Sequence, residues 1–356
     1  MTNLFEPFAL GPLTLPNRLV IAPMTRNRAT EGGVPTELVA EYYAQRASAG
    51  LIIAEAATPS AVGQTYPNIT ALHTDAHQEG WRRVVRAVHG RMFLQLQHGG
   101  RVGHPDTSGR TPVAPSPVPL PEPVHTPTGR QAAVTPRELT GDEVRATIAD
   151  FARAARRAVD AGFAGVEVHG ANGYLLHQFL AENTNHRTDS YGGSPENRAR
   201  FAAEVVAAVV AEIGADRTGL RISPGNTVNG IAEGDPLVVY PPLLDAVAHH
   251  GLAYLHVAFA DPGSQAYKEI RTRWTGTLIA NPVLPVDRVP DDGGRAAAER
   301  LLAAGADLIA LGRPFLANPD LVERLRAGAP VNQVRERYLM YVGGPTGYTD
   351  YPTLAG

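Results

Sequence analysis

Short apolar segments alternate with longer amphipathic segments along most of the chain. Eight short runs are rich in β-branched and other apolar residues, as expected for parallel strands that are buried on both faces. These predicted strands cover residues 18–22, 51–55, 91–96, 165–169, 219–223, 254–258, 277–280 and 308–311. The chain thus carries a regular series of core strands.

Most gaps between these strands carry apolar residues at every third or fourth position, which is typical of helices. This spacing predicts helices over 36–48, 77–89, 142–161, 195–213, 236–250, 294–304 and 319–327. The link 259–276 shows the weakest helical pattern. Eight strands that alternate with helices predict an α/β protein with a closed (β/α)₈ TIM barrel. An open doubly wound sheet is the alternative, but no G-x-G-x-x-G motif follows any predicted strand.

The longest predicted insertion, 99–141, lies between the third and fourth strands. It contains nine prolines and little periodicity. Its position inside the strand series favours an ordered excursion over the barrel mouth rather than a disordered linker. We therefore predict a single domain over residues 1–356, capped by residues 99–141.

Composition narrows the possible functions. Apolar residues make up 44% of the 356 residues and charged residues 19%, which is typical of a folded globular protein. The net charge of −3 argues against nucleic acid or an anionic membrane as a partner. The absence of cysteine excludes disulfides, thiolate catalysis and iron–sulfur clusters. The longest apolar run, 205–211, is too short to span a membrane, so we expect a cytoplasmic protein.

Polar residues gather where the predicted strands end, which is the end at which such barrels carry their active sites. They include hydrogen-bond donors, a tyrosine, and a Gly-Arg pair after the last strand that fits a phosphate. Carboxylates are few and no His-x-His is present, so we predict no metal site. The single lysine, Lys268, lies in a link, which disfavours Schiff-base chemistry. This inventory suits a protein that binds and orients a reactive cofactor.

Six motifs resemble, in sequence and in order, the Old Yellow Enzyme family of flavin-dependent ene-reductases. They lie at 22–26 (APMTR), 95–101 (QLQHGGR), 169–175 (HGANGYL), 187–201, 312–321 and 347–352 (GYTDYP). The resemblance implies bound FMN, with NADPH or NADH as hydride donor. The flavin contacts it implies are Pro23, Met24, Thr25, Ala56, Gln95, Arg221, Ala280, Asn281, Gly312 and Arg313.

The same resemblance implies the residues that meet the substrate. His169 and Asn172 are the implied donors to a carbonyl or nitro oxygen, and Tyr174 is the implied proton donor. Two donors on one oxygen stabilise a developing enolate, and a tyrosine stays protonated at neutral pH. The residues implied to line the substrate site are Tyr66, Gln97 and Tyr351. Gln97 departs from the family pattern, because many relatives carry tryptophan there.

The expected activity is NAD(P)H-dependent reduction of electron-poor C=C bonds in α,β-unsaturated carbonyls, maleimides and nitroalkenes. Reductive attack on nitrate esters or nitroaromatics by the same flavin is an alternative. A non-catalytic flavin-binding protein is a third hypothesis, and the intact His169, Asn172 and Tyr174 argue against it. We expect small electron-poor alkenes as partners and leave open a monomer or a homodimer.

Overall fold

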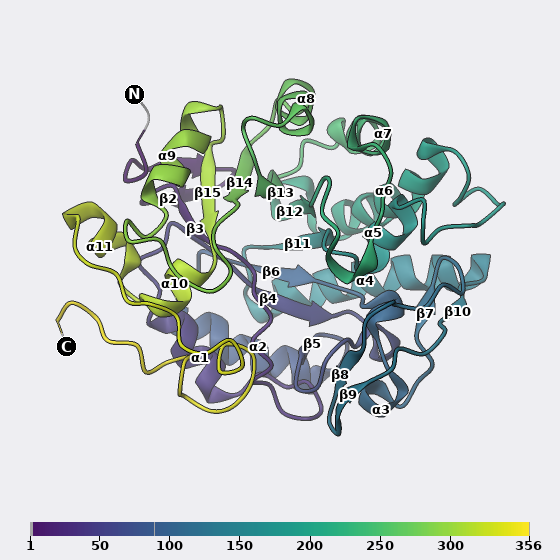
Figure 1. The fold of residues 1–356 in the computed structure, drawn as a ribbon, viewed down its shortest axis with the longest axis horizontal. Coiled ribbons are helices and arrows are strands. Elements are labelled where there is room, and N and C mark those ends of the chain that lie inside the picture. The colour runs from purple at the N-terminus through teal and green to yellow at the C-terminus, as the bar shows by residue number, and fades with distance from the viewer. Residues whose placement is uncertain (1–2, 89, 356) are drawn as a thin grey trace.

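The computed structural model describes residues 3–88 and 90–355, and its centre is a closed barrel (Figure 1). Eight parallel strands follow the order β3-β15-β14-β13-β12-β11-β6-β4, and β4 pairs with β3 to close the ring. Their bounds are β3 Leu19–Ile21, β4 Leu51–Thr58, β6 Met92–Leu96, β11 Gly165–Gly170, β12 Thr218–Ile222, β13 Tyr254–Ala260, β14 Leu278–Pro282 and β15 Leu308–Leu311. Each predicted strand overlaps one of these, which confirms the predicted (β/α)₈ barrel.

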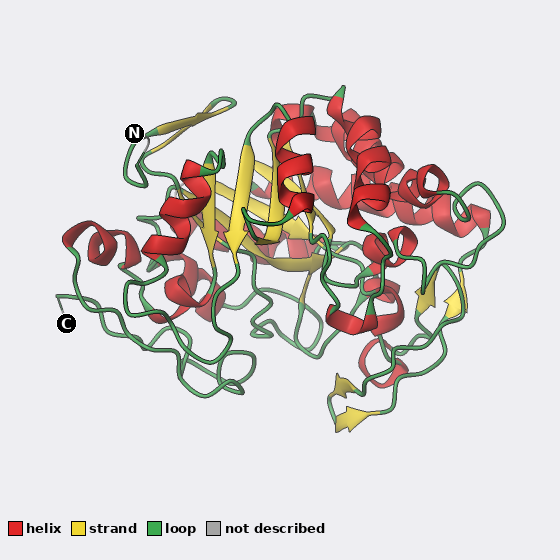
Figure 2. Ribbon diagram, turned by 45° about the horizontal axis from the view of Figure 1, so that its top comes forward, coloured by secondary structure: helices red, strands yellow, loops and turns green. Residues whose placement is uncertain are grey.

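Helices lie around the outside of the strands (Figure 2). The helices that match predictions are α1 Glu37–Ala44, α2 Asp75–Val88, α4 Gly141–Ala161, α6 Pro195–Ile213, α7 Pro236–Ala248, α9 Arg295–Ala303 and α11 Leu321–Ala327. The predicted last residue of the second helix, His89, lies outside the described residues. Within the described ranges, 3–88 and 90–355, no helix is long and apolar enough to cross a bilayer.

The link with the weakest helical pattern also forms a helix, α8 (Gln265–Arg273). Ser264 begins it, because its hydroxyl accepts a hydrogen bond of 3.2 Å from the backbone N–H of Tyr267. Only Tyr267 and Ile270 of this helix are buried, so the apolar face was too narrow to predict the element firmly. The pattern also missed two short helices, α5 (Leu175–Leu180) and α10 (Arg313–Ala317).

Residues 99–141 form short elements outside the barrel. They contain η2 Gly100–Val102, α3 Pro105–Ser108, a parallel pair of β7 Val113–Ala114 with β10 Arg137–Glu138, and a hairpin of β8 Val124–Thr126 with β9 Gly129–Gln131. Val102, Leu120 and Val124 form a small apolar cluster against which Tyr66 and Tyr174 pack. The excursion therefore reaches predicted site residues. Its role as a cap and the single domain over 1–356 stay predictions.

The remaining short elements lie at the edges of the barrel. They are the hairpin of β1 Phe8–Leu10 with β2 Leu13–Leu15, β5 Thr70–Ala71 beside β4, and the single turns η1 Ala61–Gly63, η3 Ala215–Arg217 and η4 Val228–Gly230.

The barrel interior changes from apolar to polar along the chain direction of its strands. An apolar cluster that includes Leu51, Phe93 and Tyr254 fills the region near the strand starts. Gly219 makes room for it, because a Cβ there would lie 2.3 Å from the ring of Tyr254. Toward the strand ends, buried polar side chains replace the apolar ones, among them Gln95, Glu167, His169, Arg221 and His256. Polar chemistry is thus concentrated at the C-terminal rim.

Candidate active site

Neighbouring strands bring several predicted site residues together at the C-terminal rim. Gln95 lies on β6, His169 on β11 and Arg221 on β12, and all three are buried. The parallel register pairs Glu167 with Gln95, and His169 with Arg221. These polar groups are therefore neighbours across adjacent strands, at the end where such barrels carry active sites.

His169 provides a neutral donor. Burial of its ring, together with the positive charge of Arg221, holds the pKa of His169 well below its usual value. The imidazole is therefore uncharged near pH 7. Its Nδ1 accepts a hydrogen bond of 3.2 Å from the backbone N–H of Ala171. The ring proton of the neutral form consequently lies on Nε2, which can donate to a ligand.

Asn172 has a fixed backbone and an unpaired side-chain oxygen. Its φ of 56° lies in the left-handed region, which asparagine adopts more readily than most residues. Its N–H donates to Ser223 Oγ over 2.9 Å, and its carbonyl accepts from Asn229 Nδ2 over 2.8 Å. The side-chain oxygen is buried and lacks a hydrogen-bond partner among the described residues. This oxygen can accept a hydrogen bond from a ligand.

Tyr174 completes the same turn. Its hydroxyl lies 3.1 Å from the hydroxyl of Tyr66, and its ring meets the His169 ring edge-on with centroids 5.1 Å apart. Burial raises the pKa of Tyr174 well above its usual value of 10. The phenol therefore holds its proton at neutral pH. The turn 169–174 places two hydrogen-bonding side chains beside one proton donor.

Arg221 joins two loops that were predicted to contact the flavin. Its guanidinium donates to the Pro23 carbonyl over 3.4 Å and to Asn281 Oδ1 over 3.0 Å. Asn281 is itself fixed, because its Nδ2 donates to the Ala310 carbonyl over 2.9 Å. Arg221 Nε is buried without a partner among the described residues. Pro23, Arg221 and Asn281 are therefore brought together, next to Ala280 in β14.

Hydrogen bonds from Arg26 and to Glu55 hold the loop after β3 in place. Arg26 Nε donates to the carbonyls of Met24 and Thr25, over 3.1 and 2.9 Å. The Arg26 backbone N–H donates to Glu55 Oε2 over 3.1 Å. Burial raises the pKa of Glu55 to about 7. Ala56 follows Glu55 in β4 and is buried. The side chain of Thr25 lies on a loop held in place by residues on either side.

Gly312 and Arg313 stand at the end of β15, as predicted. A Cβ on Gly312 would lie 2.9 Å from Met24 Sδ, so glycine permits the close approach of the two loops. Arg313 Nε is buried without a hydrogen-bond partner in the described part of the chain. Gln95 is held by Glu167, whose Oε1 accepts from Gln95 Nε2 over 2.7 Å.

The three residues predicted to line the substrate site have different surroundings. Tyr66 bonds Tyr174, and Gln97 is buried with its Nε2 donating to Thr65 Oγ1 over 3.1 Å. Tyr351 instead packs in the core, where its hydroxyl accepts from the backbone N–H of Arg335 over 3.0 Å. No contact recorded among the described residues joins Tyr351 to Tyr66 or Tyr174.

A different tyrosine, Tyr341, reaches the predicted site. Its ring lies under the Arg26 guanidinium, 4.8 Å from ring centroid to Cζ. Against the effect of burial, the charges of Arg26, Arg313 and Arg337 lower the pKa of Tyr341, and a hydrogen bond from Arg313 to its hydroxyl adds to this effect. Burial raises the pKa values of Tyr66 and Tyr174, and the nearby Tyr341 hydroxyl adds a smaller increase to both. The sequence reasoning missed Tyr341, because no strand or helix pattern marks the segment around it.

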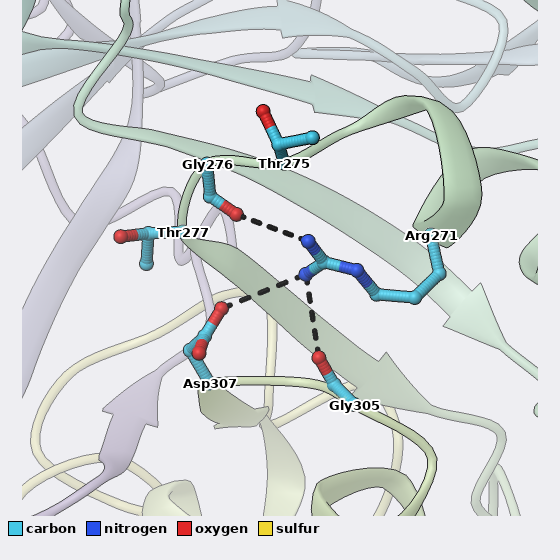
Figure 3. A pocket seen from close by; sticks show the side chains of 6 residues that line it. All are labelled: Arg271, Thr275, Gly276, Thr277, Gly305 and Asp307. Carbon is cyan, nitrogen blue, oxygen red and sulfur yellow. Dashed lines mark hydrogen bonds and ion pairs between the residues drawn. The ribbon is translucent and has the colours of Figure 1, made fainter.

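A pocket of about 440 Å³ lies at the other end of the barrel (Figure 3). It is bounded by the residues that precede β14 and β15. Arg271 donates to the carbonyls of Trp274, Gly276 and Gly305, and its Nη1 lies 3.6 Å from Asp307 Oδ2. Its cation is therefore satisfied by the protein, and no predicted site residue lines this pocket.

The residues at the rim fit an anionic flavin nucleotide. Arg313 and Arg221 each keep a buried nitrogen without a partner among the described residues. One such cation suits a phosphate, and the other suits a ring that gains negative charge on reduction. A closed parallel barrel with these groups and a protonated tyrosine at one rim defines a cofactor-dependent oxidoreductase.

Comparisons with known proteins agree with this class. The model of the NADH:flavin oxidoreductase / NADH oxidase family matches residues 3–332. The chain is 40% identical to 12-oxophytodienoate reductase 1 of Oryza sativa subsp. japonica over 368 residues, which cover 99% of this chain and 93% of that protein. The chain therefore belongs to the NADH:flavin oxidoreductase family and is an NAD(P)H:flavin oxidoreductase of the Old Yellow Enzyme type.

Solved structures give the same result. The Old Yellow Enzyme homologue from Zymomonas mobilis superposes with a TM-score of 0.93 at 39% identity, covering 99% of this chain and 100% of the other. Morphinone reductase in complex with tetrahydroNAD superposes with a TM-score of 0.91 at 43% identity, covering 99% and 98%. The family predicted from the six motifs is confirmed.

Proposed function

We propose that this flavin oxidoreductase reduces activated C=C bonds in small α,β-unsaturated carbonyls, maleimides and nitroalkenes. The observation that carries the proposal is the turn 169–174, where a neutral His169, the side-chain amide of Asn172 and a protonated Tyr174 lie together. The rice relative, named as a reductase of 12-oxophytodienoate, supports the same substrate class.

Two side chains of the turn would activate the substrate. His169 donates from Nε2, and the Asn172 amide donates to the same carbonyl or nitro oxygen. Both withdraw electron density from the conjugated alkene and stabilise the negative charge that develops on the oxygen. Because His169 is neutral, it donates a hydrogen bond without transferring a full positive charge to the site.

Tyr174 would supply the proton. Its raised pKa keeps the phenol protonated until the substrate gains charge. Tyr66 is positioned to support it, since the two hydroxyls are 3.1 Å apart. Once hydride has been added at the β-carbon, Tyr174 would protonate the α-carbon of the resulting enolate, and solvent would restore the proton of Tyr174 directly or through Tyr66.

The residues proposed to hold FMN are Pro23, Met24, Thr25, Ala56, Gln95, Arg221, Ala280, Asn281, Gly312 and Arg313. Bound FMN would supply the hydride-transfer chemistry that links NADPH or NADH to the β-carbon of the alkene. Arg313 would bind the phosphate, and Arg221 would favour negative charge on the reduced ring. Tyr66, Gln97 and Tyr351 remain the predicted substrate-lining residues, and Tyr341 joins them on its contacts with Arg26 and Arg313.

Product analysis tests this function. The purified holoprotein is incubated with NADPH and 2-cyclohexenone without oxygen, and we expect cyclohexanone in a one-to-one ratio with oxidised NADPH. In D₂O, we expect deuterium at the α-carbon, because the proton that Tyr174 delivers there exchanges with solvent. Parallel incubations with a nitrate ester and a nitroarene distinguish the alternative chemistry.

A matched control variant tests whether loss of any buried phenol lowers turnover. Tyr267→Phe removes another phenol, from the outer helix α8, and should leave turnover of 2-cyclohexenone unchanged. Rapid release of nitrite from the nitrate ester, with no cyclohexanone formed, would instead favour the alternative. Absence of any NADPH oxidation by the FMN-loaded protein would indicate a non-catalytic flavin-binding protein.

A further inference from the structure

Arg28 is a buried cation whose partners are all backbone carbonyls. It is 4% exposed, and its five N–H groups meet five acceptors. Nη1 donates to Arg26 and Met340, Nη2 to Leu339 and Val342, and Nε to Gly344, over 2.7–3.3 Å. Four of these carbonyls belong to residues 339–344, more than 300 positions away along the chain. One guanidinium therefore fixes the course of this segment.

Three stacked side chains, Tyr348, Tyr42 and Arg46, support the guanidinium of Arg28 on one side. Its Cζ lies 4.3 Å from the Tyr348 ring centroid, and that ring stacks on Tyr42 with centroids 4.2 Å apart. The guanidinium of Arg46 covers the other face of Tyr42 at 3.8 Å. Arg46 also donates to the carbonyls of Phe315, Leu316 and Tyr348. Arg28 thus links the loop after β3 to α1 and to the C-terminal part of the chain.

The segment held by Arg28 carries Tyr341 to the predicted substrate site. Tyr341 lies between Met340 and Val342, whose carbonyls both accept from Arg28. Its ring lies under Arg26, and its hydroxyl bonds Arg313. Because the backbone on both sides of Tyr341 is tied to one guanidinium, the placement of its ring depends on Arg28.

We infer that Arg28 is a positioning residue of the active site, which acts by holding Tyr341 against the substrate. The inference rests on the proposed function, because that function defines the substrate site. The contacts of Arg28 with residues 339–344 are observed in the structure itself. Arginine is required, because a lysine ammonium has three N–H groups and no planar fork to meet five carbonyls in different directions.

A double-mutant cycle on the FMN-loaded protein tests this inference. The probe is 4-chlorophenol, titrated by its effect on the flavin absorbance. Arg28→Lys and Tyr341→Ala should each weaken its binding by about tenfold, within the range of coupled neighbours. In the double variant the loss should stay near tenfold, since Arg28 acts through Tyr341. KM for 2-cyclohexenone should rise in Arg28→Lys more than kcat falls.

Arg198→Lys is the matched control. Arg198 is also buried and donates to the carbonyls of Leu180 and Gly193, but to none in 339–344. Its variant should bind 4-chlorophenol like the wild type. A ligand-free measurement accompanies the cycle, namely the rate of trypsin cleavage after the exposed Arg337, which should rise in Arg28→Lys and not in Arg198→Lys.

Two outcomes overturn the inference. Losses that multiply to about a hundredfold in the double variant would show that the two residues act independently. Unchanged trypsin cleavage after Arg337 in Arg28→Lys would show that the segment does not depend on the guanidinium. The proposed function can fail while this inference stands. That result would be a wild-type protein that forms no cyclohexanone from 2-cyclohexenone, together with non-additive losses of 4-chlorophenol binding in the Arg28 and Tyr341 variants.

Discussion

Two polar clusters at opposite ends of the barrel differ in how far the protein satisfies them. At the C-terminal rim, Asn172 Oδ1, Arg221 Nε and Arg313 Nε are buried without partners among the described residues. In the pocket at the strand starts, Arg271 meets three carbonyls and Asp307. The charges of this pocket already have protein partners.

The difference shows which cluster is prepared for a ligand. A buried polar atom without a partner typically costs about 1–3 kcal/mol relative to a hydrogen-bonded one. Several buried polar atoms without partners at one rim are expected where a bound molecule forms hydrogen bonds with them. The Arg271 guanidinium carries no comparable cost, although the hydroxyl of Tyr267 in the same helix is also unpaired among the described residues. The hydrogen bonds of Arg271 join α8 to the links before β14 and β15. We therefore expect a ligand at the rim, whereas the hydrogen bonds of Arg271 connect structural elements.

The largest effect is expected from removing the proton donor at the rim. Tyr174→Phe should slow reduction of 2-cyclohexenone by about 10²–10⁴-fold, because general acid catalysis has that magnitude. Bleaching of the bound flavin by NADPH needs no acid and should keep a near-native rate. Rapid mixing of the two steps, each measured separately, provides the comparison.

The outcome for Tyr174 separates two roles. Equal slowing of both steps would mean that Tyr174 only packs beside the flavin. An unchanged rate with 2-cyclohexenone would assign the proton to another group. Nitroalkenes offer a second check, since their nitronate product is stable before protonation and should be less affected by the variant.

The next largest effect concerns the cation at the end of β15. Arg313→Ala should weaken FMN binding by about 1.5–3 kcal/mol, the usual range for a charge-assisted hydrogen bond. Release of flavin on dilution, followed by its fluorescence, measures the change. Arg271→Ala removes an arginine from the opposite end and should retain FMN. Full flavin retention by Arg313→Ala at nanomolar protein would place the phosphate elsewhere.

A smaller effect is expected for the two donors of the turn. His169→Ala and Asn172→Ala should each weaken binding of 4-chlorophenol by about tenfold, because each removes one hydrogen bond to a phenolate oxygen. The long-wavelength charge-transfer absorbance over oxidised flavin reports the binding. Ser116→Ala, on the excursion, is a control that should leave the band intact. A band that persists in both turn variants would move the oxygen site away from residues 169–172.

The fold was predictable because its strands follow local rules. Fully buried parallel strands need short apolar runs, and the run at 51–55 extends to Thr58 in the structure with every residue buried. The rim residues were predictable for a related reason, since a polar residue at the end of such a run faces the active-site end. His169 and Arg221 were found in this way, and the register pairs them.

The parts that escaped prediction depend on contacts between distant segments. Tyr341 lies in no regular element, and a guanidinium at position 28 places it. Asn229 holds the backbone of Asn172 from a single left-handed turn that no periodicity marks. Motifs identified the family, whereas tertiary contacts decide which of their residues reach the site.

The smallest effect on activity is expected at the Arg271 pocket. Arg271→Ala leaves the carbonyls of Gly276 and Gly305 without their donor and removes the partner of Asp307, so the free energy of unfolding should fall by about 1 kcal/mol. The exposed edge of this pocket lets water replace part of the loss. Because the pocket lies at the strand starts, kcat and KM for 2-cyclohexenone should remain at wild-type values. Urea unfolding and steady-state kinetics on one preparation test both statements, and a KM that changes with unaltered stability would give this pocket a ligand-binding role.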